Sequence, residues 1–142
     1  MKRYLSLAVC ALLILSVIFQ SGCAFLGGNV SNVSVSKVSS DIYSDKDIND
    51  AIDVVKNYFA TYYQGCTLKE VRFEGDDLEE YRSRKKETNA DEVIVLVSDF
   101  VTGSGKEIEE GPLDANAEYS NYNWVLVRNK GKRWSVYTYG YG

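Results

Sequence analysis

The fold is decided by Tyr122-Asn-Trp-Val-Leu-Val-Arg128, which runs through Asn129-Lys-Gly131 into Arg133-Trp-Ser-Val-Tyr-Thr-Tyr139. Aromatic and β-branched residues dominate both halves of this stretch, and such residues favour strands. The asparagine and the glycine between them supply the positive φ angles of a tight turn. The end of the chain is therefore predicted to be a β-hairpin.

The strongest strand signal precedes this hairpin and extends from Asp91 to Val101. Its centre, Val93-Ile-Val-Leu-Val97, is an unbroken apolar run, which predicts a strand that is covered on both faces. Residues 102–120 then contain three glycines and the only proline of the chain. A connection of nineteen residues is long for a compact domain, so this segment is expected to be either a working loop or disordered.

A pattern typical of an amphipathic helix of about eighteen residues lies further upstream. Ser44 and Asp47 form a short version of the capping box at its start, and Gly65 is placed to end it. Residues 67–73 favour a strand, and a second helix is predicted from residue 78 to about residue 88. The basic run of that second helix is interpreted as a solvated face rather than as a partner-binding patch.

This order of elements predicts an α+β fold. A long N-terminal helix and a second short helix are expected to pack on a curved, mainly antiparallel sheet of about four strands, cone-like in shape. Residues 42–142 form this domain. Residues 23–41, which are rich in glycine, serine and asparagine, are expected to be a flexible tether.

The first 22 residues are predicted to be a lipoprotein signal peptide. Lys2 and Arg3 precede an uncharged apolar stretch, Leu5 to Phe19, which covers roughly 22 Å as a helix and is short for a bilayer core of roughly 30 Å. Gln20-Ser-Gly-Cys23 follows and resembles a lipobox, although Gln20 stands where an aliphatic residue is usual. Two alternatives stay open: an uncleaved membrane anchor, and ordinary secretory cleavage with Cys23 incidental.

The resemblance to a lipobox implies that Cys23 is the lipidation site, carrying acyl chains such as palmitate. Two or more chains hold a protein stably in a bilayer. The partner it implies is the lipid bilayer, and the expected localisation is the extracytoplasmic side of the cell membrane. Loss of Lys2 and Arg3 leaves 14 basic and 20 acidic residues, a formal charge of −6, which disfavours a nucleic-acid partner.

The composition also limits the chemistry. The chain has no histidine, which removes the commonest general base and metal ligand. After loss of Cys10 and acylation of Cys23, Cys66 is the one remaining cysteine and is interpreted as a core residue. The acidic residues between Glu107 and Glu118 lack the spacing of a calcium loop, so a solvated loop is preferred. No metal, cofactor or catalytic residue is predicted.

Two family resemblances cover roughly residues 42–142. The long helix and the ending Trp124-Val-Leu-Val-Arg-Asn-Lys-Gly-Lys-Arg-Trp134-Ser-Val resemble the nuclear transport factor two-like (cystatin-like α+β) fold. Asp50-Ala-Ile-Asp-Val-Val-Lys-Asn-Tyr-Phe59, Gly65-Cys-Thr-Leu68 and Ala90-Asp-Glu-Val-Ile-Val-Leu96 are similar to uncharacterised small lipoproteins of gut Firmicutes. The second resemblance implies a location in the cell envelope and implies no activity.

The resulting hypothesis is a ligand- or partner-binding domain without catalysis, whose partner is an envelope protein, a peptide or a glycan. The alternative, which the cone-like resemblance implies, is a small isomerase or dehydratase in which Asp99 abstracts a proton beside tyrosine hydroxyls. Aromatic residues that simply fill a small core are the plain alternative to a binding face. The candidate binding face comprises Tyr122, Trp124, Trp134, Tyr137 and Tyr139.

Overall fold

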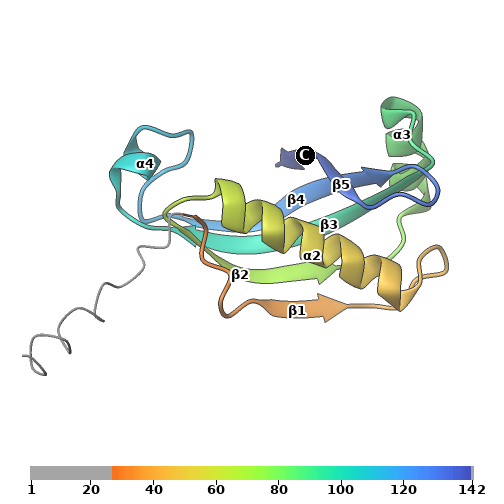
Figure 1. The fold of residues 1–142 in the computed structure, drawn as a ribbon, viewed down its shortest axis with the longest axis horizontal. Helices are drawn as coiled ribbons and strands as arrows, with labels where there is room; N and C mark the ends of the chain where they lie inside the picture. The colour runs from red at the N-terminus through yellow and green to blue at the C-terminus, as the bar shows by residue number, and fades with distance from the viewer. Residues whose placement is uncertain (1–26, 142) are drawn as a thin grey trace, which may run out of the picture.

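The computed structural model describes residues 27–141 (Figure 1). The predicted signal peptide 1–22, with Gln20, and the predicted lipidation site Cys23 lie outside the described residues. Within residues 27–141 a five-stranded sheet is accompanied by three helices. Their bounds are β1 Ser34–Lys37, α2 Asp45–Tyr62, β2 Cys66–Phe73, α3 Leu78–Thr88, β3 Glu92–Thr102, α4 Lys106–Glu109, β4 Glu118–Arg128 and β5 Ser135–Gly140.

The predicted fold class is wrong in its details. In the described part of the chain the sheet has five strands rather than about four, in the order β1-β2-β3-β4-β5. The sheet is mixed, because β1 pairs with β2 in parallel while the other pairs are antiparallel. The long helix α2 follows β1 instead of standing first, and a third helix, α4, lies in the connection after β3.

The strand that the sequence does not reveal is β1. All four of its residues are exposed, so the alternation of buried and exposed side chains that marks a strand is missing. It is held by its backbone, with Ser34 opposite Glu70 and Lys37 opposite Phe73. Part of the segment predicted to be a flexible tether therefore belongs to the sheet.

The chain is docked on the domain even before β1. The Gly28 N–H donates to the Ala60 carbonyl at the end of α2, 3.1 Å away. Asn29 then bridges to β2, because its N–H donates to the Cys66 carbonyl at 2.9 Å and its own carbonyl accepts from the Leu68 N–H at 3.0 Å. A Cβ added at Gly28 would lie 2.4 Å from the Phe59 carbonyl oxygen, so only glycine allows this approach.

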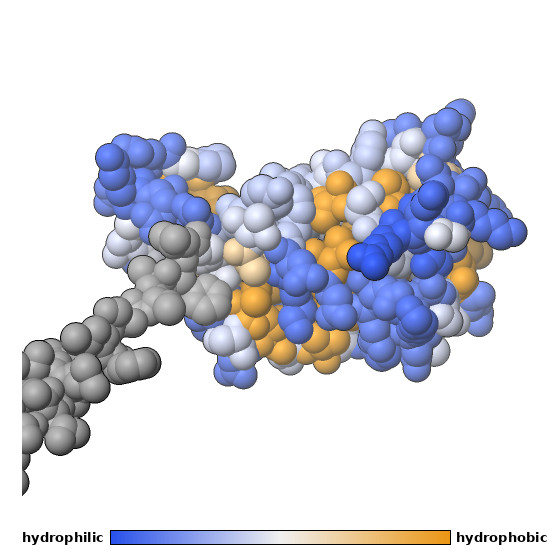
Figure 2. All heavy atoms as spheres, viewed as in Figure 1, coloured by the Kyte–Doolittle hydropathy of each residue, from blue (hydrophilic) through white to orange (hydrophobic). Residues whose placement is uncertain are grey.

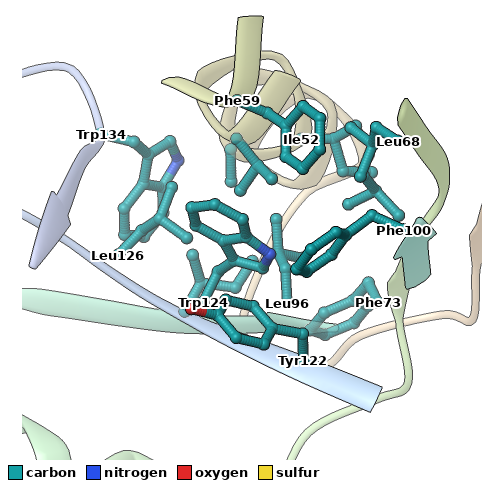
Figure 3. Packing of buried hydrophobic residues seen from close by; sticks show 14 of the residues in the cluster. Ile52, Phe59, Leu68, Phe73, Leu96, Phe100, Tyr122, Trp124, Leu126 and Trp134 are labelled. Carbon is teal, nitrogen blue, oxygen red and sulfur yellow. The ribbon is translucent and has the colours of Figure 1, made fainter. Parts of the chain in front are cut away.

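Helix α2 covers one face of the sheet (Figure 1). Its capping box forms as the pattern predicts, since the Ser44 hydroxyl accepts from the Asp47 N–H at 3.1 Å. The core between helix and sheet is hydrophobic and rich in aromatic rings (Figure 3). Trp124 is fully buried there, and its Nε1 donates to the Ser98 hydroxyl at 2.8 Å, so the buried indole nitrogen is satisfied.

The opposite face of the sheet is only partly covered. Val93, Val97 and Val125 are buried there, while Val95 is half-buried. Helix α3 contacts β3 without burying any of its own residues completely, because it is strongly polar. The continuous apolar run of β3 is thus covered on both faces over most of its length.

The predicted C-terminal hairpin forms with a longer turn. Gly131 has a φ of 77°, whereas Asn129 is not among the residues with positive φ. The Lys132 N–H closes the turn by donating to the Asn129 carbonyl at 2.8 Å. Strand β5 starts at Ser135, so Trp134 precedes it. None of the helices in residues 27–141 combines the length and the apolar composition needed to cross a bilayer.

Candidate functional site

A cavity of about 230 Å³ opens where α2 ends. It lies between the last residues of α2, the segment that carries α4, and strands β4 and β5. Figure 2 shows a recess between the lobe that carries α4 and the body of the domain. Four tyrosines, Tyr62, Tyr63, Tyr122 and Tyr139, contribute to its lining, and Glu107, Ile108 and Leu113 contribute from the loop.

The end of α2 places two of the tyrosines. Tyr63 terminates the helix with its N–H still donating to the Phe59 carbonyl at 3.0 Å. Gly65 follows with a φ of 74°, which turns the chain back into β2. The Tyr63 ring is buried and stacks on Phe59 at 4.6 Å, while Tyr62 remains 66 % exposed at the rim. The helix terminus therefore supplies both a floor and a rim to the cavity.

The loop between β3 and β4 is an ordered wall of this cavity. The Thr102 hydroxyl donates to the Asp114 carbonyl at 2.6 Å and accepts from the Ala117 N–H at 2.9 Å. The Tyr119 hydroxyl accepts from the Asp114 N–H at 2.9 Å. Ile108 of α4 is buried in the core and anchors the loop. Residues 102–120 were expected to be either a working loop or disordered, and the structure shows an ordered loop.

Burial keeps the hydroxyls of two cavity tyrosines, Tyr63 and Tyr122, protonated at physiological pH. Burial, and then the hydrogen bond between the Tyr63 and Tyr122 hydroxyls at 3.3 Å, raises the pKa of Tyr63. Burial also raises the pKa of Tyr122. A hydrogen bond with Tyr139, followed by burial, raises the pKa of Tyr58 to about 12. These phenols can donate and accept hydrogen bonds but are poor acids and bases near pH 7.

Cys66 lines the same cavity and is buried. Loss of solvent around the sulfur raises the pKa of its thiol to about 11. A thiol with that pKa is a weak nucleophile at neutral pH, because the thiolate is the reactive form. The sequence-based interpretation of Cys66 as a core residue agrees with this position.

The predicted binding face is not one surface. Tyr122 and Tyr139 line the cavity, as described above, but Trp124 has no exposed area and belongs to the core. Tyr137 is 48 % exposed and lies where the pairing of β4 and β5 is irregular, outside the cavity lining. The alternation of side chains along a strand shows which face of the sheet a ring points to. It cannot distinguish a ring in the core from a ring in the cavity, because both lie on the same face.

Trp134 has a structural position instead of a binding one. Its Nε1 donates to the Asp47 carbonyl in the first turn of α2, 3.1 Å away. The Arg128 guanidinium lies over the indole ring at 4.2 Å and pairs with Asp47 at 2.8 Å and with Glu92 at 2.6 Å. Trp134 therefore fixes the hairpin against the helix, and little of it is left to contact a ligand.

Asp99 lies on the other face of the sheet from the cavity. Its neighbours Ser98 and Phe100 point into the core, so alternation turns Asp99 away from α2. Partial burial opposes ionisation of Asp99, but hydrogen bonds from Arg72 and from the Asn121 N–H prevail and lower the pKa of its carboxyl. The enzymatic alternative required Asp99 and a tyrosine hydroxyl in one cavity, and the structure does not bring them together.

Sequence reasoning missed the loop residues of the site. Glu107, Ile108 and Leu113 lie in a segment without hydrophobic periodicity, so nothing local indicates which way their side chains point. In the described part of the chain no three His, Cys, Asp or Glu side chains gather in a way that could hold a metal ion.

Comparison of the chain with protein-family models, with curated proteins and with solved structures found no match. The resemblances to small lipoproteins of Firmicutes and to the nuclear transport factor two-like fold therefore stay predictions.

Proposed function

We propose that this chain is a membrane-anchored extracytoplasmic lipoprotein whose domain binds a ligand in the tyrosine-lined cavity and performs no catalysis. The cavity is the observation that carries this proposal. It combines aromatic walls with a small number of polar groups, as small-molecule sites usually do, and one of its walls is an ordered loop. The anchor would be lipid on Cys23.

The described residues around the cavity favour binding over catalysis. The thiol of Cys66 and the phenols of Tyr63 and Tyr122 are all held in their neutral forms by burial. The chain has no histidine to activate any of them. Nucleophilic catalysis needs a base within hydrogen-bonding reach of the nucleophile. Among the described lining residues Glu107 carries the one carboxylate, so it is the one side chain that could take that role.

The docked N-terminal segment bears on how the domain would sit on a membrane. Gly28 is already hydrogen-bonded to the end of α2, and Gly27 lies only four positions after Cys23 in the sequence. A chain reaches at most roughly 3.6 Å per residue, so lipid on Cys23 would hold Gly27 within roughly 14 Å of the membrane surface. The same end of α2 carries Tyr62 and Tyr63, so the cavity would lie near the bilayer rather than at the end of a long tether.

Ligand binding can be tested with two exposed tyrosines of one strand. The full chain is screened by ligand-observed NMR against glycan fragments, short peptides and small envelope metabolites. Tyr139→Ala, which removes a cavity ring, is expected to weaken any hit at least tenfold. Tyr137→Ala, which removes an equally exposed ring outside the lining, is the matched control. A hit that both variants weaken equally, or that neither weakens, argues against the cavity.

The anchor is tested separately by mass spectrometry of the mature N-terminus. Diacylated or triacylated Cys23 is the expected form, and Cys23→Ala is expected to abolish it. An unmodified Cys23 would support ordinary secretory cleavage, and an intact Met1 would support an uncleaved anchor. Gln20→Leu restores the usual residue of a lipobox and is expected to speed processing if Gln20 slows it.

A further inference from the structure

We infer that the cavity at the end of α2 takes an organic cation, a ligand that presents an alkylated ammonium group to the tyrosine rings and to Glu107. This inference rests on the proposed binding function and names the chemical class of the ligand.

The charge around the cavity favours a cationic ligand. Among the described residues that line it there is one charged side chain, the carboxylate of Glu107. The same loop carries Glu109 and Glu110, and its one base, Lys106, is paired with Glu110 at 3.6 Å. The local potential is therefore negative. Such a potential attracts cations and repels phosphates and carboxylates.

The aromatic rings favour a cationic ligand independently of the charge. The ring centroids of Tyr63, Tyr122 and Tyr139 lie 5.9 to 6.5 Å from one another, so three electron-rich systems meet at one wall. Figure 3 shows the Tyr122 ring beside Trp124, in the aromatic cluster that backs this wall. Alkylammonium groups are attracted to such ring faces by the aromatic quadrupole.

Protonation of the phenols keeps the rings of Tyr63 and Tyr122 uncharged. Burial raises the pKa of Tyr63 and of Tyr122, so both stay protonated at neutral pH. Tyr139 is 44 % exposed and Tyr62 is 66 % exposed, so these two rings remain accessible from solvent. The alkyl groups of the ammonium can thus contact the rings while its positive charge is attracted to the carboxylate of Glu107.

The size of the cavity sets an upper limit on the group that enters. A closed apolar cavity of roughly 150 Å³ holds one benzene-sized molecule. The volume here is about 230 Å³, which admits a trimethylammonium group and a short alcohol or a single ring. The group can belong to a soluble metabolite or to the headgroup of a membrane lipid, since both present the same chemistry.

The test compares a cation with its neutral isostere. The full chain in non-ionic detergent micelles is titrated by calorimetry with choline and with 3,3-dimethylbutan-1-ol, in which carbon replaces the charged nitrogen. Choline is expected to bind about tenfold more tightly, the factor that corresponds to roughly 1.4 kcal/mol. Equal affinities would overturn the inference and leave an apolar binding site, so the proposed function would stand.

Two variants assign the selectivity to the cavity. Glu107→Gln is expected to weaken choline severalfold and to leave the neutral alcohol unchanged. Glu109→Gln, at an exposed carboxylate of the same short helix that does not line the cavity, is expected to weaken choline by less than about twofold, because Glu109 contributes only to the screened long-range potential. Loss of choline binding in both variants would indicate a diffuse charge effect and contradict the inference. If neither compound binds, the inference fails, and the proposed function is then decided by the NMR screen and Tyr139→Ala.

The source of the cation is resolved by repeating the titration in lipid nanodiscs. If lipid headgroups enter the cavity, choline will bind more weakly in phosphatidylcholine discs than in phosphatidylglycerol discs, because the headgroup competes. Equal binding in the two discs assigns the site to soluble cations. Choline binding that is absent from both discs but present in micelles would overturn the assignment of the cavity as an accessible cation site.

Discussion

The Arg72 guanidinium lies 2.7 Å from the carboxylate of Asp99, on the face of the sheet that α2 does not cover. Both groups also contact Asn121, since Asp99 accepts from its N–H at 2.8 Å and Arg72 donates to its side-chain oxygen at 2.9 Å. Asn121 has a φ of 58°, and the pairing of β3 with β4 shifts register beside it. Asp99 therefore stabilises an irregular bend that precedes Tyr122 of the cavity.

Replacing Asp99 by Asn is expected to lower the free energy of unfolding by roughly 1–3 kcal/mol at pH 7, because a charged acceptor is lost from two partners. The folded state lowers the pKa of this carboxyl. Its contribution is therefore full above the pKa of an unfolded Asp, about 3.9, and is lost as the pH falls through the folded value. Urea unfolding at pH 7 and at pH 3 should show the difference shrinking. Asp53→Asn, at an exposed carboxylate, is the control, and an equal loss at pH 3 would contradict this account.

Replacing Ser98 by Ala is expected to destabilise the domain by roughly 1–3 kcal/mol, because the buried Nε1 of Trp124 would lose its acceptor. The change removes a single oxygen atom, so lost packing contributes little. Urea unfolding followed by tryptophan fluorescence measures the effect. Ser36→Ala removes an exposed hydroxyl that bonds Glu70 and should change stability by less than about 0.5 kcal/mol. Equal effects of the two variants would show that the buried bond adds nothing.

Replacing Gly28 by Ala is expected to detach the N-terminal segment from α2. The added Cβ would lie 2.4 Å from the Phe59 carbonyl oxygen and 2.7 Å from the Phe59 ring, so the segment or the helix end must move. Amide hydrogen exchange at Asn29 and Leu68 should accelerate, since their hydrogen bonds join this segment to β2. Ser39→Ala, at an exposed residue, is the control. Unchanged protection in Gly28→Ala would refute the docking.

Stability is expected to fall at alkaline pH because of the buried tyrosines. Burial raises the pKa of Tyr63 in the folded protein, while the unfolded chain ionises near pH 10. The unfolded state loses protons first, so stability stays level below about pH 10 and declines above it. In Tyr63→Phe the decline should be smaller, as measured by denaturant midpoints between pH 9 and pH 12. Tyr62→Phe, at an exposed ring, is the control and should retain the full decline.

The local elements were predictable because their signals are local. The capping box at Ser44 and the stripe of Ile48, Ile52, Val55 and Phe59 depend on residues three or four positions apart, and α2 forms over them. The turn at Gly131 and the apolar run of β3 are likewise readable within a short window. The prediction of about four strands was wrong because β1 has no buried residue to mark it, and its backbone pairs with a strand more than thirty positions away.

What the sequence by itself determined is therefore a set of periodicities, an acidic charge without histidine, and a signal-like N-terminus with Cys23. Only the tertiary structure decided that Trp124 fills the core while Tyr139 lines a cavity, and that Asp99 meets Arg72 on the far face. The physical reason is that burial and pairing depend on what other segments bring to the same place. Residues 27–33 illustrate this, because their composition suits a linker and their contacts with α2 and β2 bind them to the domain.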